Sequence, residues 1–324
     1  MDLTVCVCTH DRPRYVRDCL AGLARQTIAR NCFDTIVVDS FSTPAARREL
    51  EDIARSHPWI RLIRIDVPGV SAARNAGAEA ARTGYIAYID DDAIPADDWI
   101  AAIHTALATE PRPAVLGGKI LPLWEVPLPD WWPASLRGVL SIIEQDGMGE
   151  YRGEALPRGL EPYACNMVVH VRSLLDSGGF GRTIGRVGRV LLSDEEVQLA
   201  WRLQNAGMSA RYDSRIAVYH QIQAGRLTPE WLLSRLYWQG VSTVLTRRLL
   251  REDAAVWREL PRRCLVALAC APVALWPRGS TRLLPMRWRL FYATGFIRAA
   301  LGWQATDAAR RIALGDTRSK HVAA

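Results

Sequence analysis

The chain has 324 residues, of which 49% are apolar and 23% charged, and this composition excludes an intrinsically disordered protein. The length suffices for a full α/β core with a smaller appendage. The net charge is +7, and arginine supplies most of the positive charge because Lys119 and Lys320 are the only lysines. Seven cysteines without a paired spacing indicate reduced thiols, and the first residues lack a signal-peptide pattern, so we expect a cytoplasmic protein.

The amino-terminal part of the chain alternates between strand-like and helix-like segments. We predict strands at 3–8, 35–39, 60–66 and 85–90, and helices at 13–25, 44–56, 71–82 and 96–108. Strands separated by helices of this length imply βαβ units and a parallel sheet. Ligands bind such sheets at the carboxyl ends of the strands, which is where Thr9, Asp39 and Asp90–Asp92 stand in this sequence.

The middle of the chain is less regular. Residues 121–159 are rich in proline, tryptophan and glycine, and we predict a long loop region of functional importance there. Beyond it we predict a strand at 165–171, a glycine-rich loop at 177–189, a helix at 193–206 and a strand at 210–220. These segments complete a domain that we expect to span residues 1–224.

Residues 225–324 have a helical pattern and form the second predicted domain. Basic residues gather here beside aromatic ones, and the apolar segments 264–276 and 290–303 are shorter or more interrupted than the roughly twenty apolar residues of a transmembrane helix. Such helices favour peripheral contact with the inner face of a membrane. The alternatives are packing on the core, a homodimer contact and a solvated basic face. We expect no nucleic-acid partner.

The most informative motif is the acidic run Asp90-Asp91-Asp92, which follows a predicted strand. Adjacent carboxylates repel each other unless they share a cation, and Mg²⁺ or Mn²⁺ commonly links one or two carboxylates to substrate phosphates. We therefore predict a divalent metal bound by Asp90 and Asp92. The alternative is a solvated acidic turn in which Asp92 or Asp97 caps the next helix. His220, at the end of another predicted strand, is either a further ligand or a structural residue.

A second acidic group, Asp194-Glu195-Glu196, stands at the start of a predicted helix. One interpretation is structural, because Ser193 and Glu196 have the spacing of a capping box. The other is chemical, because a carboxylate at the rim of a site can accept a proton from a hydroxyl group. We favour Glu196 as this general base and keep Asp194 and Glu195 as alternatives.

Five segments, taken in order, resemble the family 2 glycosyltransferases of the GT-A fold. They are VCVCTHDRPRYVRDCLAGLARQT, VVDSFST, GVSAARNAGAEAARTGYIAYIDDDAIPADDWI, NMVVHVRSLLDSGGF and SDEEVQLAWRLQNAG, and they cover roughly residues 1–225. The resemblance implies a GT-A-type, mostly parallel sheet flanked by helices, followed by a C-terminal helical extension. It also implies an inverting bacterial enzyme that uses a divalent metal and a nucleoside diphosphate sugar.

The resemblance assigns nucleotide-binding roles by position. Thr9 and Arg12 match the first loop around the nucleotide, and Asp39 matches the acid that contacts the base and ribose. The pair Arg74-Asn75 matches the segment near the diphosphate. Ser40 follows Asp39 where the family usually has a second acid, so the resemblance does not specify the nucleobase.

The resemblance also assigns the reacting groups. Asp90 and Asp92 match the outer acids of the DxD metal motif, with Asp91 between them on the donor side. Glu196 matches the family's base, six residues before Arg202, in a pair that reads Glu-Glu rather than the usual Glu-Asp. The implied acceptor is a hydroxyl group of a surface polysaccharide, a lipid-linked sugar or a specialised metabolite.

Four further residues are candidates for the acceptor or phosphate side. Arg186 and Arg189, in the glycine-rich loop, can hold phosphates or stand in solvent. Trp131 and Trp132 offer flat faces for a sugar or a lipid-proximal acceptor, or they are core residues or membrane anchors.

Two rival functions remain at this point. A sugar-nucleotide nucleotidyltransferase would be expected to carry a glycine-rich loop and a nearby lysine after the first strand, and THDRPRY has neither. A non-catalytic scaffold that binds sugar nucleotides at a membrane surface would bind nucleotide and metal without turnover. A dinucleotide-binding oxidoreductase is excluded because no GxGxxG follows the first strand.

Overall fold

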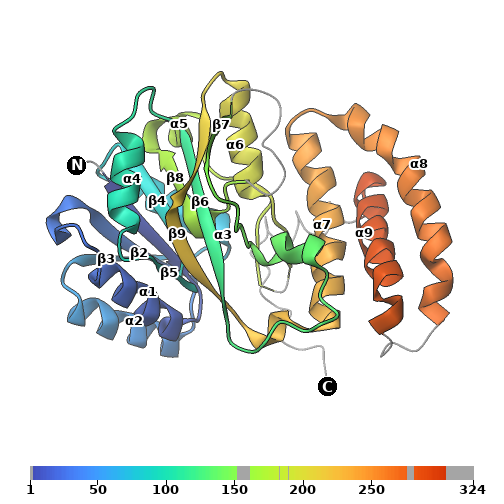
Figure 1. Cartoon of the computed structure of the whole chain (residues 1–324), viewed down its shortest axis with the longest axis horizontal. Helices are drawn as coiled ribbons and strands as arrows, with labels where there is room; N and C mark the ends of the chain where they lie inside the picture. The colour runs from blue at the N-terminus through green and yellow to red at the C-terminus, as the bar shows by residue number, and fades with distance from the viewer. Residues whose placement is uncertain (1–2, 152–160, 182, 189, 276–280, 304–324) are drawn as a thin grey trace. The chain divides into compact units, whose positions relative to one another are not determined.

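The computed structural model describes residues 3–151, 161–181, 183–188, 190–275 and 281–303. The chain divides into two units, each with its own internal contacts (Figure 1). The first unit comprises Met1–Glu125, Ser135–Phe180 and Leu199–Ile222, and the second comprises Val126–Ala134, Gly181–Gln198 and Gln223–Ala324. Both units therefore combine separate stretches of sequence, and a domain boundary near residue 224 stays a prediction.

The first unit contains the predicted parallel strands. These are β1 (Leu3–Thr9), β2 (Asp34–Ser40), β3 (Ile60–Ile65) and β4 (Tyr85–Asp90), in the spatial order β3-β2-β1-β4. The connecting helices are α1 (Pro13–Ala24), α2 (Pro44–Ser56) and α3 (Val70–Ala80). Because β1, β2 and β4 are buried along most of their length, they read as nearly continuous apolar runs in the sequence. The predicted βαβ units are confirmed.

The other half of the sheet is mixed. It contains β5 (Ala93–Pro95), β6 (Val115–Trp124), β7 (Met148–Tyr151), β8 (Met167–His170) and β9 (Ala210–Ile222), with α4 (Trp99–Leu107) and α5 (Val171–Asp176). Strand β8 runs antiparallel to β4 and β6, whereas β9 runs parallel to β6 and antiparallel to β5 and β7. The predicted α/β sheet flanked by helices is confirmed, but its parallel character is limited to one half and the β6–β9 pair.

The prediction of one long loop at 121–159 is wrong for part of that range. Residues Leu121–Trp124 complete β6, residues Ala134–Leu140 form a 3₁₀ helix, and Met148–Tyr151 form β7. Pro122 and the glycine pair Gly117-Gly118 obscure the strand pattern of β6. Gly118 is needed because a Cβ there would lie 2.1 Å from the backbone oxygen of Ile216 on β9.

The second unit is mainly helical. Its helices are α7 (Pro229–Leu249), α8 (Asp253–Cys270) and α9 (Leu284–Ala300). Helix α7 begins as the sequence indicates, with the Thr228 hydroxyl accepting a hydrogen bond from Trp231 N at 3.2 Å. Among the described residues, no helix combines the length and apolarity needed to span a bilayer.

Glycines bring α7 and α9 of this unit into backbone contact. A Cβ at Gly240 would lie 2.2 Å from the backbone oxygen of Tyr292, and a Cβ at Gly295 would lie 2.0 Å from that of Tyr237. Only glycine fits at such distances, so these two positions fix how closely α7 and α9 approach.

Candidate active site

Three parallel strands of the first unit end in polar residues at one edge of the sheet. Thr9 on β1 is in register with Asp39 on β2, and Cys8 on β1 is in register with Asp90 on β4. The structure therefore brings together Thr9, Asp39 and Asp90, which stand far apart in sequence. This is the edge at which open α/β sheets bind their ligands.

Arg12 neutralises the acidic run that follows β4. Its Nη1 donates to Asp92 Oδ2 at 2.8 Å, its Nε donates to Asp91 Oδ2 at 3.1 Å, and its Nη2 is paired with Asp91 Oδ1. Thr9 Oγ1 also donates to Asp91 Oδ2, at 2.7 Å. Asp91 and Asp92 are buried, whereas the Asp90 side chain is 31% exposed. The three acids thus have different surroundings, and Asp90 is the most accessible to a ligand.

The protonation equilibria of this cluster reflect burial and neighbouring charge. Burial raises the pKa of Asp91 to about 7, although the positive charge of Arg12 acts in the opposite direction. Burial acts to lower the pKa of Arg12, but the negative charges of Asp92 and Asp91 outweigh it and raise that pKa. The guanidinium therefore stays charged, and it stabilises the carboxylates beside it.

Arg74, at the other side of Asp90, is a buried arginine on α3. Its Nη2 lies 3.3 Å from Asp90 Oδ1, and its guanidinium lies 5.5 Å from the centre of the Phe180 ring. Tyr88 on β4 donates to the Arg74 backbone oxygen at 2.9 Å and so ties α3 to the strand. Arg74 thus places a buried guanidinium beside the accessible carboxylate of Asp90, and guanidinium groups can donate hydrogen bonds to phosphate oxygens.

Asn75 links α3 to the loop after α5. Its Nδ2 donates to Phe180 O at 3.0 Å, and its Oδ1 accepts from Phe180 N at 2.7 Å. Gly179 has φ 74° and approaches so closely that an added Cβ would lie 2.6 Å from Asn75 Oδ1. These contacts give Asn75 a supporting role for the loop, and a contact with the diphosphate stays a prediction.

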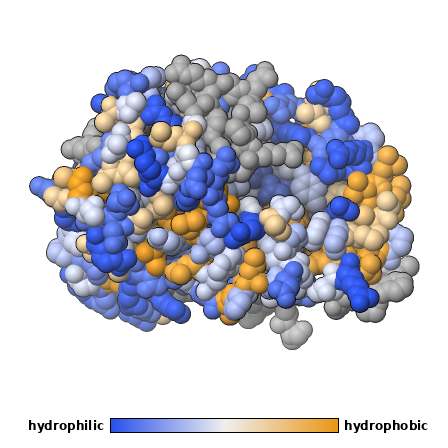
Figure 2. All heavy atoms as spheres, in the orientation of Figure 1, coloured by the Kyte–Doolittle hydropathy of each residue, from blue (hydrophilic) through white to orange (hydrophobic). Residues whose placement is uncertain are grey.

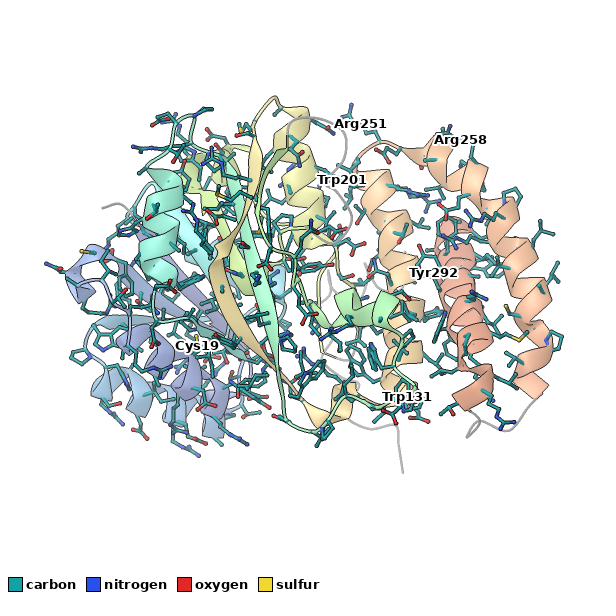
Figure 3. The ribbon with its side chains drawn as sticks, viewed as in Figure 1. Cys19, Trp131, Trp201, Arg251, Arg258 and Tyr292 are labelled. Carbon is teal, nitrogen blue, oxygen red and sulfur yellow. The ribbon has the colours of Figure 1, made fainter. Side chains whose placement is uncertain are left out.

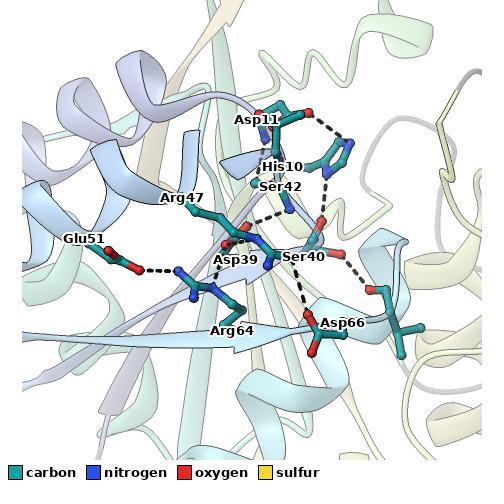
Figure 4. Close-up of polar contacts among 11 residues, drawn as sticks. His10, Asp11, Asp39, Ser40, Ser42, Arg47, Glu51, Arg64 and Asp66 are labelled. Carbon is teal, nitrogen blue, oxygen red and sulfur yellow. Dashed lines mark hydrogen bonds and ion pairs between the residues drawn. The ribbon is translucent and has the colours of Figure 1, made fainter. Parts of the chain in front are cut away.

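Asp39 is fully buried and faces two arginines (Figure 4). Its Oδ2 lies 3.5 Å from Arg64 Nε and 3.9 Å from Arg47 Nε, and its Oδ1 accepts from Ser42 N at 3.2 Å. Arg64 also donates to Glu51 Oε1 at 2.7 Å. The nearby positive charges offset the cost of burying this carboxylate, whose oxygens can accept a hydrogen bond from a ligand.

Hydrogen bonds fix the loops around Asp39. His10 Nδ1 lies 2.7 Å from Ser40 O, and Asp11 N donates to Ser42 Oγ at 2.8 Å (Figure 4). Ser40 stands where the resemblance predicts a second acid after Asp39. Its hydroxyl donates a hydrogen bond to Val67 O at 3.1 Å. This hydrogen bond joins the end of β2 to the loop before α3.

His220 is buried on β9, opposite Ala93 of β5. Its Nδ1 lies 3.0 Å from Leu140 O, which can only accept, so Nδ1 carries a proton and Nε2 faces Asp92 Oδ1 at 3.5 Å. Metal-binding histidines commonly donate their other ring N–H to a backbone carbonyl in this way.

The donor atoms suit a metal that is shared with a ligand. Within the described residues, no group of three or more histidine, cysteine or acidic side chains is arranged to hold a metal by itself. Asp90, Asp92 and His220 nevertheless supply oxygen and nitrogen donors that Mn²⁺ accepts. Mg²⁺ and Mn²⁺ sites that are completed by substrate phosphates need only one or two protein carboxylates, so these residues fit such an ion.

The second acidic group, Asp194-Glu195-Glu196, lies in the second unit, where helix α6 (Glu195–Asn205) begins. Gln198 N donates to Asp194 O at 2.8 Å, so Asp194 rather than Ser193 precedes the helix. The capping box of Ser193 and Glu196 is therefore out of register. Burial raises the pKa of Asp194, and hydrogen bonds from Gln239 and Ser193 partly offset it.

The remaining candidates also lie in the second unit. Trp132 is buried, and its ring centre lies 5.4 Å from that of Trp131 and 6.5 Å from that of Trp231. Trp131 is labelled in Figure 3. Arg186 is half-buried, and Arg189 lies outside the described residues. The aromatic cluster supports the core interpretation for Trp132, while a contact of Trp131 with a ligand stays a prediction.

The profile described as Glycosyl transferase family 2 matches residues 4–135, which contain Asp39 and the acidic run. The chain matches glycosyltransferase family 2 over these residues. Its similarity to curated family members extends well beyond the matched residues. The chain is 25% identical over 245 residues to a glucosyl-dolichyl phosphate glucuronosyltransferase of Haloferax volcanii, covering 75% of this chain and 76% of that protein.

Two other similar proteins are covered by this chain to different extents. The chain is 27% identical over 236 residues to a pre-mycofactocin glycosyltransferase of Mycobacterium tuberculosis, covering 72% of this chain but 46% of that protein. It is 23% identical over 257 residues to the succinoglycan biosynthesis protein ExoM of Rhizobium meliloti, covering 78% of this chain and 77% of that one. The chain thus spans less than half of the mycobacterial protein.

Solved glycosyltransferase structures share the GT-A fold with this chain. A mannosyltransferase from Pyrobaculum calidifontis, solved with GDP-Man and Mn²⁺, aligns with a TM-score of 0.57 and 18% identity over 94% of this chain and 87% of its own. Residues 1–349 of S. aureus TarS, solved with UDP, align with a TM-score of 0.53 and 14% identity over 93% and 92%. These similarities confirm the predicted fold class.

Arg47 and Arg64, which face Asp39, were not predicted from the sequence. The signal for Arg64 is its strand position, because the residue pairs in register with Asp39 across β2 and β3. Arg47 is near the start of α2, and nothing in its spacing distinguishes it from its neighbour Arg48. The support that Gln239 gives to Asp194 was missed as well, because the two residues are 45 positions apart.

Proposed function

We propose that this glycosyltransferase moves a sugar from a nucleoside diphosphate sugar to an acceptor hydroxyl with inversion at the anomeric carbon, using Mn²⁺ or Mg²⁺. The observation that carries the proposal is the common edge of β1, β2 and β4. There a buried acid, Asp39, stands beside the partly exposed acid Asp90 and the guanidinium groups of Arg12 and Arg74.

The two parts of this edge suit the two parts of a nucleotide sugar. Asp39 offers a charged acceptor for the N–H or O–H groups of a base or ribose. Arg74 and Arg12 offer guanidinium groups to phosphate oxygens, which they bind with favourable geometry. The complexes of related folds with GDP-Man and with UDP support a donor of this class.

Asp90, Asp92 and His220 are the residues that would hold the metal. A bound Mn²⁺ or Mg²⁺ would neutralise negative charge on the diphosphate. Arg12 already stabilises Asp91 and Asp92 from the protein side, so it keeps the acids together before any ligand arrives. The Mn²⁺ in the Pyrobaculum mannosyltransferase supports this choice of ion.

We assign the general base to Glu196, in the first turn of α6. It takes the proton of the acceptor hydroxyl as the oxygen bonds to the anomeric carbon. The bond from that carbon to the diphosphate breaks on the opposite face, and the nucleoside diphosphate leaves. Attack opposite the leaving group inverts the configuration of the sugar.

We further propose a lipid-linked acceptor. The name of the Haloferax relative, which specifies a glucosyl-dolichyl phosphate, supports this class of acceptor. Trp131, beside Trp132 in the second unit, offers a flat face to a sugar ring. Arg186, which is half-buried in the same unit, offers a guanidinium to an acceptor phosphate.

An outward face of α8 supports contact with an anionic membrane surface. Trp257, Leu265 and Leu268 are 52%, 67% and 71% exposed, and Arg258 and Arg262 are exposed among them. The carboxylates of α8 are paired, Asp253 with Arg248, and Glu259 with Arg247 and Arg263. The apolar spheres at the right edge of Figure 2 belong to the region where α8 lies in Figure 1.

The replacement Glu196→Gln tests the proposed chemistry. It should leave nucleoside diphosphate binding intact and lower turnover by about 10²- to 10⁴-fold, the usual contribution of a general base. Release of nucleoside diphosphate from UDP- and GDP-sugars measures turnover, and NMR of the product measures inversion. The matched variant Glu195→Gln should stay active. Unchanged turnover in Glu196→Gln would contradict the assignment, and donor binding without turnover in the parent would favour a non-catalytic scaffold.

A further inference from the structure

Helix α7 holds the residues that lead into α6. Gln239 Nε2 donates to both carboxylate oxygens of Asp194, at 3.0 and 2.9 Å. Ser193 N donates to Ser242 Oγ at 2.9 Å, and Arg235 Nη2 donates to Ser193 Oγ at 3.1 Å. Three residues of one helix thus bind two consecutive residues that lie more than forty positions earlier in the sequence.

The backbone at Asp194 needs this support. Its φ is 75°, in the left-handed region that glycine adopts readily and other residues seldom occupy. Its carbonyl oxygen accepts the first hydrogen bond of α6, from Gln198 N at 2.8 Å. The conformation of Asp194 therefore sets the residue at which α6 begins and the direction in which it starts.

Apolar contacts of the same unit anchor the segment and the helix that holds it. Leu192 is fully buried in a cluster with Val241 and Val244 of α7 and Phe296 of α9. The close approach of α7 to α9 at Gly240 fixes the helix itself. The polar groups of α7 are consequently preorganised for Ser193 and Asp194 before any substrate binds.

We propose that Gln239 is a positioning residue for glycosyl transfer: it holds Asp194 in its left-handed conformation and thereby fixes Glu196 in the first turn of α6. This inference rests on the proposed role of Glu196 as the base. It gives Asp194 the role of an anchor, and it makes the C-terminal helices part of the catalytic machinery.

The replacement Gln239→Leu tests the positioning role, because it keeps much of the side-chain volume and removes the amide. We expect kcat to fall by about 10- to 100-fold, as for a small displacement of a reacting group, with little change in the KM for the donor. Binding of UDP or GDP with Mn²⁺ should match that of the parent. The control is Thr243→Val, one turn further along α7, where the lost hydrogen bonds join the Gln239 backbone oxygen and the Tyr292 hydroxyl and the Gln239 amide stays in place. That variant should lose stability but keep kcat.

The replacements at Asp194 test the backbone argument. Asp194→Gly adopts a positive φ without support, so it should retain much more activity than Asp194→Ala. In the Asp194→Gly background, Gln239→Leu should lower kcat by at most about threefold, because glycine adopts the positive φ without the hydrogen bonds from Gln239. Equal losses in the Gly and Ala variants, or a full effect of Gln239→Leu in the Gly background, would overturn the proposal.

Different experimental results would refute the positioning role of Gln239 and the base assignment of Glu196. If Glu196→Gln keeps its turnover, the assignment of the base is wrong, whatever Gln239 does. If Glu196→Gln is inactive and Gln239→Leu behaves like Thr243→Val, the base assignment stands and the positioning role is refuted.

Discussion

At the scale of single residues, the acidic run illustrates how a protein stabilises neighbouring carboxylates. From the sequence alone, a divalent metal is the cation that three adjacent acids are expected to require. Arg12, which the resemblance placed near the nucleotide, also pairs with Asp91 and Asp92 and is a second cation at the same position. The metal is therefore expected mainly at Asp90 and the side of Asp92 that faces His220.

Asp39 offers a prediction at the same scale. Replacing it with asparagine removes the charged acceptor while keeping its shape. Because hydrogen bonds to charged groups contribute about 1.5–3 kcal/mol, binding of the preferred nucleoside diphosphate should weaken by about 10- to 150-fold. Isothermal titration calorimetry with UDP and GDP measures the change, and the requirement for Mn²⁺ should persist.

The control for Asp39→Asn is Asp66→Asn. Asp66 is exposed and pairs with Arg47 at the surface, so its replacement should leave nucleotide affinity unchanged. The melting temperature without ligand shows whether each variant is folded. A folded Asp39→Asn variant that binds as tightly as the parent would rule out the role of Asp39.

At the scale of elements, long and buried strands can be predicted from the sequence, whereas short strands cannot. The strands β1, β2 and β4 are predictable because they are buried runs of apolar and β-branched residues between helices with clear starts. Strand β5 has three residues and begins directly after Asp92, where the sequence indicates a turn. Two of the four residues of β7 are methionine and glycine, which do not indicate a strand. The strand forms through its pairing with β9.

The beginning of α6 shows a different limit of sequence reasoning. Ser193 and Glu196 have the correct spacing for a capping box, and a local pattern cannot reveal that Asp194 takes a left-handed conformation. That conformation depends on Gln239, which is distant in sequence. The edge that holds Thr9, Asp39 and Asp90 was predictable because strand ends of a parallel sheet meet by topology, whereas contacts between side chains of distant segments are not encoded in a local pattern.

At the scale of the whole molecule, the face of α8 predicts binding to anionic vesicles. The full chain should float with vesicles of phosphatidylcholine and phosphatidylglycerol and bind less to phosphatidylcholine alone, with salt weakening the binding. Replacing Leu265 and Leu268 with serine removes apolar contact worth about 1.5–3 kcal/mol for each residue on full burial. Replacing Arg258 and Arg262 with glutamine removes about 1 kcal/mol for each residue. Both double variants should stay in the unbound fraction.

The matched control for the vesicle experiment is Leu175→Ser, which changes an exposed leucine on α5 of the first unit. It should float like the parent. A parent chain that stays unbound would contradict the membrane proposal, as would a dimer in solution that the Leu265 and Leu268 replacements dissociate.

We propose that the acidic run and Asp39 bind a nucleoside diphosphate together with a divalent metal. Thermal unfolding of the parent with UDP, GDP or dTDP, with and without Mn²⁺, tests it most directly. One nucleotide should stabilise the parent by about 2.7 kcal/mol at a hundred times its Kd, only when Mn²⁺ is present. Asp92→Ala should lose this response, whereas Asp97→Ala, which removes an exposed acid paired with Arg25, should keep it. A folded Asp92→Ala variant that responds like the parent would contradict the account.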